Sequence, residues 1–237
     1  MASRLVVLDA AGTLLELRRP VGQTYAELAR RVGVELDPAT LERAFHRTFR
    51  AAPPLAFGHL EPALRRAAER DWWRRLVRDC VAEAGAPLDL PFDRLFDLAW
   101  EALGGPAPWR VPDDVRPGLR VLRRQGHPLA VLSNWDGRLS GLLDGLGLRG
   151  YFARILVSAD LPAAKPDTAA FEAARDAVAD LAQDPPVMVG DRIDHDVEPA
   201  LAAGWGAIWL DREGRGSALP EGAARVPSLR AFALDPL

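Results

Sequence analysis

The chain has 237 residues, of which 49% are hydrophobic and 27% are charged, and its formal net charge is −3. This length suits one large domain, or a core domain with a smaller insert, and the slightly acidic balance excludes the basic surface typical of nucleic-acid binding. No apolar stretch approaches the ~20 residues of a membrane span, no signal-peptide pattern is present, and the lone Cys80 excludes an internal disulfide. We therefore expect a soluble cytoplasmic protein that binds a small molecule and contacts neither nucleic acid nor a membrane.

Five short apolar runs predict buried strands, at residues 5–8, 129–132, 155–157, 187–189 and 207–210. Runs of this length without polar alternation are typical of strands buried on both faces of a parallel sheet. Helical patterns, most of them ended by a glycine, lie before or between the last four runs, at residues 117–125, 139–146, 167–181 and 197–203. Strand and helix thus alternate up to residue 210, which predicts right-handed βαβ units.

Between the first strand and residue 107 the pattern is helical throughout. Amphipathic faces recur near residues 25–32 and 41–48, and longer helical patterns cover residues 62–84 and 92–103. The sequence therefore predicts an α/β fold. Its core is a doubly wound, Rossmann-like parallel sheet of residues 1–16 and 107–237, with an inserted all-helical domain of residues 17–106. The pattern after residue 211 is too weak to assign elements.

Polar residues follow the predicted strands at the point where each strand ends. Asp9 ends the first strand, Ser133 and Asn134 end the second, Lys165 follows the third by a loop, and Asp191 follows the fourth. Since ligands of doubly wound sheets bind at the carboxyl ends of the strands, we expect these side chains to meet in one site. Lys165 is the single lysine among 30 basic residues, which favours a role for a compact ammonium there.

The segment GDRIDHD places Asp191, Asp194 and Asp196 within six positions. Together with Asp9 they would repel one another unless a cation lay among them, and oxygen ligands favour a hard ion such as Mg²⁺. For Asp194 the alternative is an acidic residue that stabilises a helix N-terminus.

Four motifs in this order and spacing resemble the haloacid dehalogenase superfamily of hydrolases: LDAAGTLL, LSN, AKPD and GDRIDHD. The helical insert resembles the α-helical (C1-type) cap of that superfamily. The segment RRPVGQTYAELARRVGVEL and the DWW at residues 71–73 are similar to a narrower subfamily, named after a rhythmically expressed gene product.

The resemblance implies a role for each matching residue. Asp9 would be the nucleophile that attacks phosphorus and forms an aspartyl phosphate, and Lys165 would neutralise charge on Asp9 and the phosphoryl group. Ser133 and the backbone amide near Asn134 would bind phosphate oxygens.

The remaining implied roles concern the metal and the first turn. Mg²⁺ would be bound by Asp9, Asp191 and the backbone carbonyl of Ala11, with Asp196 completing the metal site by orienting Lys165 or a metal-bound water. Gly12 and Thr13 would shape the turn beside the bound phosphate, Gly12 by its conformational freedom and Thr13 by a hydrogen bond back onto the turn.

The chain departs from the superfamily at Ala11, where its phosphatases have a second aspartate that acts as general acid and base. Loss of such a group costs on the order of 10²–10⁴ in rate. One interpretation is a Mg²⁺-dependent phosphohydrolase of small phosphorylated molecules with good leaving groups, in which Asp194, His195, His59 or Tyr25 could supply the missing acid. A second is a non-catalytic protein that keeps the phosphate and metal site for binding.

A third interpretation is a 2-haloacid dehalogenase, because halide leaves without a proton. Asp191 speaks against it, since dehalogenases of this superfamily usually lack that aspartate. Cleavage of phosphonates is nearly excluded, because it requires a cap lysine and no lysine precedes Lys165.

Overall fold

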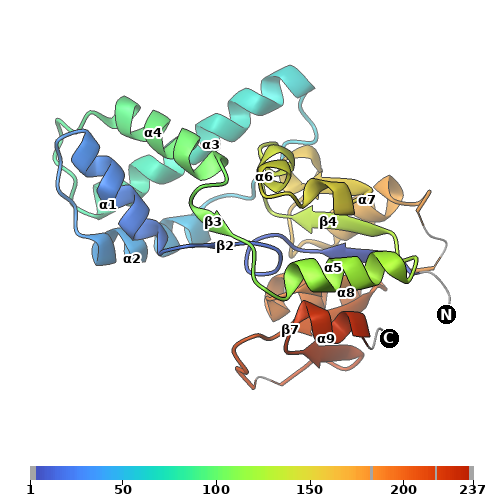
Figure 1. Ribbon diagram of the computed structural model, residues 1–237. Coiled ribbons are helices and arrows are strands. Elements are labelled where there is room, and N and C mark those ends of the chain that lie inside the picture. Colours follow the sequence, from blue (N-terminus) through green and yellow to red (C-terminus); the bar gives the residue numbers. More distant parts are fainter. Residues whose placement is uncertain (1–3, 182–183, 217, 235–237) are drawn as a thin grey trace. The chain divides into compact units, whose positions relative to one another are not determined.

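The computed structural model describes residues 4–181, 184–216 and 218–234, and the chain divides into two compact units. The first unit comprises Met1–Glu16, Leu55–Glu61 and Val111–Leu237, and the second comprises Leu17–Pro54 and Pro62–Arg110. Figure 1 shows the second unit as helices coloured from blue to green.

A six-stranded parallel sheet forms the centre of the first unit. Its strands are β1 (Val6–Leu8), β4 (Leu129–Ser133), β5 (Arg154–Val157), β6 (Val187–Gly190), β7 (Gly206–Leu210) and β8 (Ala223–Val226). Their order is β5-β4-β1-β6-β7-β8, so the chain builds outward from β1 in both directions. This confirms the predicted doubly wound α/β fold and its five strands. Strand β8 is additional, and it lies after residue 211, where the sequence pattern predicts no element.

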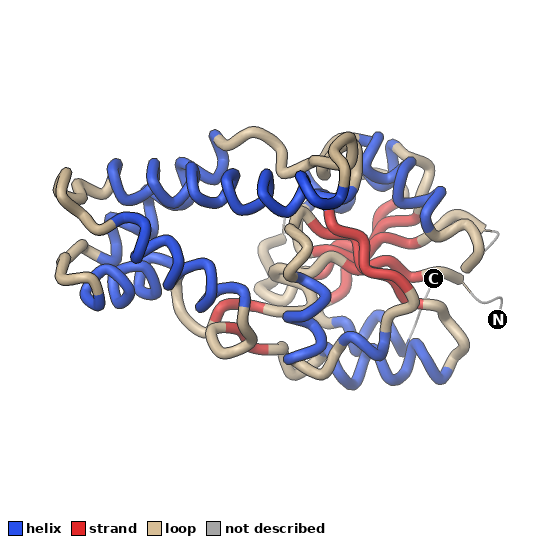
Figure 2. The backbone as a smooth tube through the Cα atoms, turned by 90° about the horizontal axis from the view of Figure 1, so that it is seen from above, coloured by secondary structure: helices blue, strands red, loops and turns tan. Residues whose placement is uncertain are grey.

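Helices precede or follow these strands. They are α5 (Val115–Arg124), α6 (Leu139–Gly145), α7 (Thr168–Ala177), α8 (Glu198–Ala202) and α9 (Leu229–Leu234), with the short 3₁₀-helices η1 (Arg149–Tyr151) and η2 (Ser158–Asp160) and the π-helix η3 (Ile193–Val197). Helix α7 begins at Thr168 because the Asp167 side chain accepts a hydrogen bond from Ala169 N at 2.9 Å. Figure 2 shows helices on both sides of the strands of this sheet.

Apolar side chains from the sheet and two helices form the core on one face. Leu5 and Val7 of the first run pack with Met188 of β6, Phe171 of α7 and Ala200 of α8, and all five are buried. On the other side α5 packs against α9, where a Cβ at Gly118 would lie 2.9 Å from Leu229. The close approach of these two helices therefore depends on a glycine.

The second unit is built of four helices: α1 (Val21–Arg31), α2 (Pro38–Ala51), α3 (Pro62–Glu83) and α4 (Phe92–Gly104). Each matches a helical pattern predicted from the sequence. Helix α2 begins after Asp37, whose side chain accepts from Thr40 N at 2.7 Å, with Pro38 in the first turn. The separate core of this unit includes buried Tyr25, Leu41 and Phe96.

Two short strands, β2 (Glu16–Leu17) and β3 (Trp109–Arg110), pair in a small second sheet. In the described part of the chain, none of the helices combines the length and apolar character that a membrane span needs.

The segment Leu55–Glu61 belongs to the first unit, although the sequence analysis placed it inside the insert of residues 17–106. Phe57 N donates to Ala159 O at 3.1 Å, and Gly58 N donates to Leu161 O at 3.0 Å. The buried Ser158 hydroxyl also donates to Leu55 O at 2.6 Å. The partners in these contacts are 102 or 103 positions apart in sequence, so hydrophobic periodicity gave no indication of them.

Candidate active site

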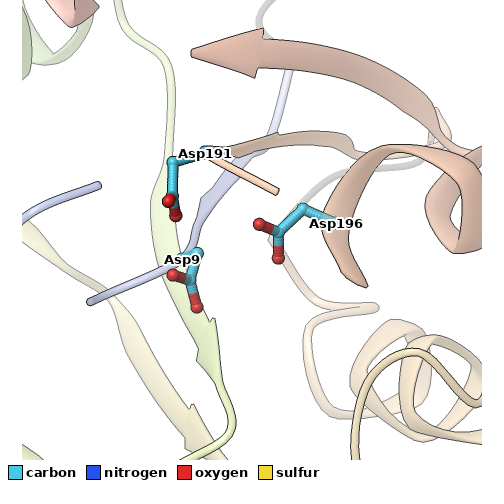
Figure 3. A group of neighbouring side chains, drawn as sticks. All are labelled: Asp9, Asp191 and Asp196. Atoms are coloured by element: carbon cyan, nitrogen blue, oxygen red, sulfur yellow. The ribbon is translucent and has the colours of Figure 1, made fainter. Parts of the chain in front are cut away.

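Asp9 and Asp191 follow neighbouring strands and therefore lie at the same edge of the sheet. In the parallel pairing of β1 with β6, Leu8 lies opposite Val189, and Asp9 N donates to Val189 O at 3.0 Å. Figure 3 shows the side chains of Asp9, Asp191 and Asp196 as neighbours, with those of Asp191 and Asp196 pointing toward Asp9. The acidic side chains that follow these strands thus lie together at the carboxyl ends of the strands, as expected.

These three carboxylates form a compact group, in which one oxygen from each lies within 4.8 Å of the other two. Burial of Asp191, together with the negative charges of Asp9 and Asp196, raises the pKa of its carboxyl group to about 7. The sequence predicted this group from acidic residues that follow two of the strands, and the structure has these residues together.

Lys165 lies between two of the carboxylates. Its Nζ donates to Asp9 Oδ1 at 2.8 Å and to Asp196 Oδ1 at 2.5 Å, and all three residues are buried. Burial alone would lower the pKa of Lys165, but the charges of Asp196 and Asp9 outweigh it and raise that pKa above its ordinary value. The lysine therefore remains an ammonium that is fixed against the predicted nucleophile.

Asp196 is held on both of its oxygens. Oδ1 accepts from Lys165, and Oδ2 accepts from the backbone N of Arg192 at 3.1 Å. A Cβ at Gly190 would lie 2.3 Å from the Asp196 carboxyl carbon, so only glycine leaves room for this side chain. Both contacts suit a residue that orients Lys165.

Asn134 contacts the backbone of Lys165 with both atoms of its amide. Nδ2 donates to Lys165 O at 2.6 Å, and Oδ1 accepts from Lys165 N at 2.9 Å. Ser133, which precedes Asn134 and is the last residue of β4, is buried. The predicted substrate role of the backbone near Asn134 stays a prediction, whereas the side chain acts on Lys165.

The loop after Asp9 folds back on itself. The backbone N atoms of Leu14 and Leu15 donate to Ala10 O at 2.8 and 3.0 Å, and Gly12 N donates to Leu15 O at 2.9 Å. Gly12 has a φ of 83°, and a Cβ on it would lie 2.5 Å from an Asp191 carboxylate oxygen, so the turn and the close approach both require glycine.

Two side chains of this loop define its chemistry. The Ala11 methyl group is exposed and carries no proton donor or acceptor. The buried Thr13 hydroxyl donates to Asp191 Oδ1 at 3.5 Å. It therefore contacts the carboxylate group, whereas the sequence analysis expected a hydrogen bond back onto the turn.

Asp194 lies apart from the carboxylate group. Its side chain is 60% exposed and accepts from Arg192 Nη2 at 2.6 Å, and His195 Nδ1 lies 3.1 Å from it. The hydrogen bond from Arg192 lowers the pKa of Asp194 to about 2, so it carries no proton to donate at neutral pH. Tyr25, another candidate for the missing acid, is buried in the core of the second unit.

Sequence reasoning missed two contacts from the chain beyond residue 207. Trp209 Nε1 donates to Asp191 O at 3.1 Å, and the Arg212 guanidinium contacts the loop after Asp9. The only available signal was that Arg212 follows the strand at residues 207–210, and arginine is too common in this chain for that signal to stand out.

The carboxylate group fits a divalent cation. Three carboxylates and the Lys165 ammonium give a formal charge of −2 when all are ionised. Burial, and after it the charges of Asp9 and Asp196, raises the pKa of Asp191. Hard oxygen donors of this kind suit Mg²⁺.

A family model for haloacid dehalogenase-like hydrolases matches residues 3–204. The mouse (Mus musculus) haloacid dehalogenase-like hydrolase domain-containing protein 3 is 35% identical over 206 residues, which cover 85% of this chain and 79% of that protein. A phosphoserine phosphatase of Thermus thermophilus is 32% identical, covering 96% of this chain and 94% of its own. Among solved structures, a 2-haloacid dehalogenase from Pseudomonas syringae pv. Tomato superposes with a TM-score of 0.65 at 25% identity, covering 98% of each chain.

The chain belongs to the haloacid dehalogenase-like hydrolase family. The superfamily resemblance inferred from the four motifs is thereby confirmed, and with it the assignment to hydrolases. The cap subtype and the narrower subfamily stay predictions.

Proposed function

We propose that the protein is a Mg²⁺-dependent phosphohydrolase of small phosphorylated molecules, with Asp9 as nucleophile. The observation that carries this proposal is the pairing of a buried ammonium with Asp9 at 2.8 Å inside a group of three carboxylates. A phosphoryl group is an anion, and an anionic nucleophile attacks it only where positive charge offsets the repulsion. The similarity to a phosphatase over nearly the full length supports the same class of substrate.

Each residue contributes a separate step. Lys165 holds Asp9 Oδ1 and fixes the plane of the carboxylate, so that attack on phosphorus forms an aspartyl phosphate with release of the leaving group. The same ammonium offsets charge that builds up on the phosphoryl oxygens. Asp196 keeps Lys165 in place, because Asp196 is itself held by Arg192 N.

Mg²⁺ would be held by Asp9, Asp191 and the Ala11 carbonyl, and it would supply further positive charge to the phosphoryl oxygens. Water attack on phosphorus then regenerates Asp9 and releases phosphate. Neither protonation of the leaving group nor activation of this water can come from Ala11. We therefore expect good substrates to be those whose leaving group needs little protonation, such as aryl and acyl phosphates.

The test is hydrolysis of para-nitrophenyl phosphate, with and without Mg²⁺, by the wild type, Asp9→Asn, Ala11→Asp and Ala11→Asn. We expect metal-dependent turnover that Asp9→Asn abolishes. Ala11→Asp should raise the rate, within the range of about 10²–10⁴ that a general acid contributes. Ala11→Asn is the matched control, because it adds the same bulk without a titratable proton.

Two results would count against the proposal. Turnover that persists in Asp9→Asn would show that Asp9 is not the nucleophile. Lack of turnover in both the wild type and Ala11→Asp would overturn the phosphatase assignment, and chloride release from 2-chloropropionate would then test dehalogenation.

A further inference from the structure

The loop that follows Asp9 is held from outside by one arginine. Arg212 Nη1 donates to Gly12 O at 2.7 Å, and Nη2 donates to Thr13 O at 2.8 Å. Two adjacent carbonyls are thus bound by the two terminal nitrogens of one planar group. The guanidinium is partly buried, with 20% of its side chain exposed.

The adjacent edge of the same guanidinium, formed by Nε and Nη2, is fixed by Asp114. Nε lies 3.1 Å from Asp114 Oδ1, and Nη2 lies 3.1 Å from Oδ2. Asp114 Oδ2 also accepts from the backbone N of Leu229 at 2.7 Å, at the start of α9. Asp114 stands at the N-cap of α5 but makes no side-chain cap bond to that helix. Its carboxylate accepts hydrogen bonds from Arg212 and from the backbone N of Leu229, and not from a backbone N in the first turn of α5.

The loop held in this way carries the features on which the metal site depends. Ala11, whose carbonyl we assign to the metal, immediately precedes Gly12, and Gly12 packs against the Asp191 carboxylate. Backbone bonds inside the loop use Ala10 O and Leu15 O as acceptors. The carbonyls of Gly12 and Thr13 accept from Arg212.

We propose that Arg212, oriented by Asp114, is a positioning residue that fixes the loop of residues 10–15 and with it the direction of the Ala11 carbonyl. The part that concerns the metal and turnover rests on the proposed function. The part that concerns the order of the loop stands by itself. An arginine is required, because a lysine ammonium cannot donate to two neighbouring carbonyls and a carboxylate in one plane.

Hydrogen exchange of the backbone amides tests the loop directly, without substrate or metal. In Arg212→Gln we expect the amides of Gly12, Leu14 and Leu15 to exchange about tenfold faster or more than in the wild type, because their protection then depends on the loop alone. Arg212→Lys should fall between the two. Ser228→Ala is the matched control for α9, because it removes the bond from Ala231 N to Ser228 Oγ at 3.0 Å and leaves the loop contacts in place.

Unchanged exchange of these amides in folded Arg212→Gln, or an equal increase in Ser228→Ala, would overturn the proposal. Should Arg212→Gln fail to fold, Asp114→Asn gives the same readout, because it loosens the arginine and leaves it present.

The functional arm measures Mg²⁺ affinity by calorimetry and kcat and KM for para-nitrophenyl phosphate. We expect Arg212→Gln to weaken Mg²⁺ binding and to lower kcat by about 10- to 100-fold, since small misplacements of a site have effects of this size. Added methylguanidinium should restore part of both in Arg212→Gly. Normal Mg²⁺ affinity and kcat in a variant whose loop amides exchange faster would overturn the link between the loop and the metal. If neither the wild type nor Ala11→Asp shows turnover, the proposed function fails, while hydrogen exchange and calorimetry still decide the role of Arg212.

Discussion

The only asparagine in the sequence holds the only lysine: both amide atoms of Asn134 bond to the peptide of Lys165, at 2.6 and 2.9 Å. The contact fixes the backbone from which the ammonium reaches Asp9. The two residues thus differ in what they bring to the site: Lys165 supplies the charge, and Asn134 holds the backbone of Lys165.

We predict that Asn134→Ala lowers the turnover of para-nitrophenyl phosphate by about 10- to 100-fold, because a displaced Lys165 no longer matches Asp9. Since Lys165 is the sole lysine, its ¹³Cε signal in lysine-labelled protein is a single reporter of the site. That signal should shift or broaden in Asn134→Ala. An unchanged signal together with unchanged turnover would show that Asn134 does not position Lys165.

Removing the ammonium should destabilise the protein. Lys165→Met leaves Asp9 and Asp196 buried without their cation, and loss of one partner of a buried pair costs about 3–5 kcal/mol. The free energy of unfolding in urea measures this. The double variant Lys165→Met/Asp196→Asn should recover part of the loss, because it removes one of the stranded charges. Equal stability of the single and double variants would show that the charges are not the cause.

The stability of the metal-free protein should depend on pH through Asp191. Its folded pKa of about 7 lies above the ordinary value of 3.8, so between these values the folded protein keeps a proton that the unfolded chain has lost. The stabilisation from Asp191 is therefore complete at low pH, falls as the pH rises toward 7, and is lost above it. The slope for one group is at most about 1.4 kcal/mol per pH unit.

Urea unfolding with EDTA at pH 5 to 8 checks this, with Asp191→Asn as the comparison, since it lacks the titrating group. The wild type should lose stability relative to Asp191→Asn across this range. Mg²⁺ binding requires the ionised carboxylate, so affinity should rise up to pH 7 and then level off. Parallel stability curves for the two proteins would contradict the assignment.

Gly12→Ala should damage both the loop and the metal site. The φ of 83° is unfavourable for alanine, and its Cβ would meet the Asp191 carboxylate at 2.5 Å. We expect a loss of stability of about 1–3 kcal/mol and weaker Mg²⁺ binding. Gly33→Ala is the matched control: its φ is also 83°, but its Cβ has nothing within 4 Å. Equal Mg²⁺ affinity in both variants would show that the contact with Asp191 does not matter.

In the second unit, arginines of α3 stack on aromatic rings of α4. The Arg70 guanidinium lies 5.2 Å from the Phe96 ring and 5.4 Å from the Trp100 ring, and it pairs with Asp97 at 2.7 Å. We predict that Arg70→Ala destabilises the protein by about 1 kcal/mol in urea unfolding, and that Arg75→Ala, at an exposed position of the same helix, has a smaller effect. A larger loss from Arg75→Ala would contradict this.

Strand-end residues were the part of the site that the sequence predicted well. Parallel strands buried on both faces have a clear apolar signature, and their carboxyl ends coincide in space, so Asp9, Asn134 and Asp191 could be placed together without coordinates. The helices of the insert were equally accessible, because each has its own apolar face and most begin or end at proline or glycine.

Contacts made by irregular segments were not accessible in this way. Arg212, Asp114 and the loop of residues 10–15 come together across 98 to 200 positions of the chain, and no periodicity marks such an arrangement. The same holds for the Asn134 side chain, whose contacts with the Lys165 backbone the sequence did not indicate. Side-chain direction at these places depends on backbone turns that only the structure defines.

The segment Leu55–Glu61 determines which parts of the chain can be exchanged between related proteins, because it belongs to the first unit but lies between the two stretches of the second. The chain passes between the two units after Glu16, Pro54, Glu61 and Arg110, so the helical unit is encoded by two separate stretches of sequence. A chimaera that exchanges this unit between relatives therefore needs two junction pairs, with residues 55–61 kept from the host. A single exchange of residues 17–110 would replace part of the host's own Rossmann-like unit, including the backbone partners of Ala159 and Leu161.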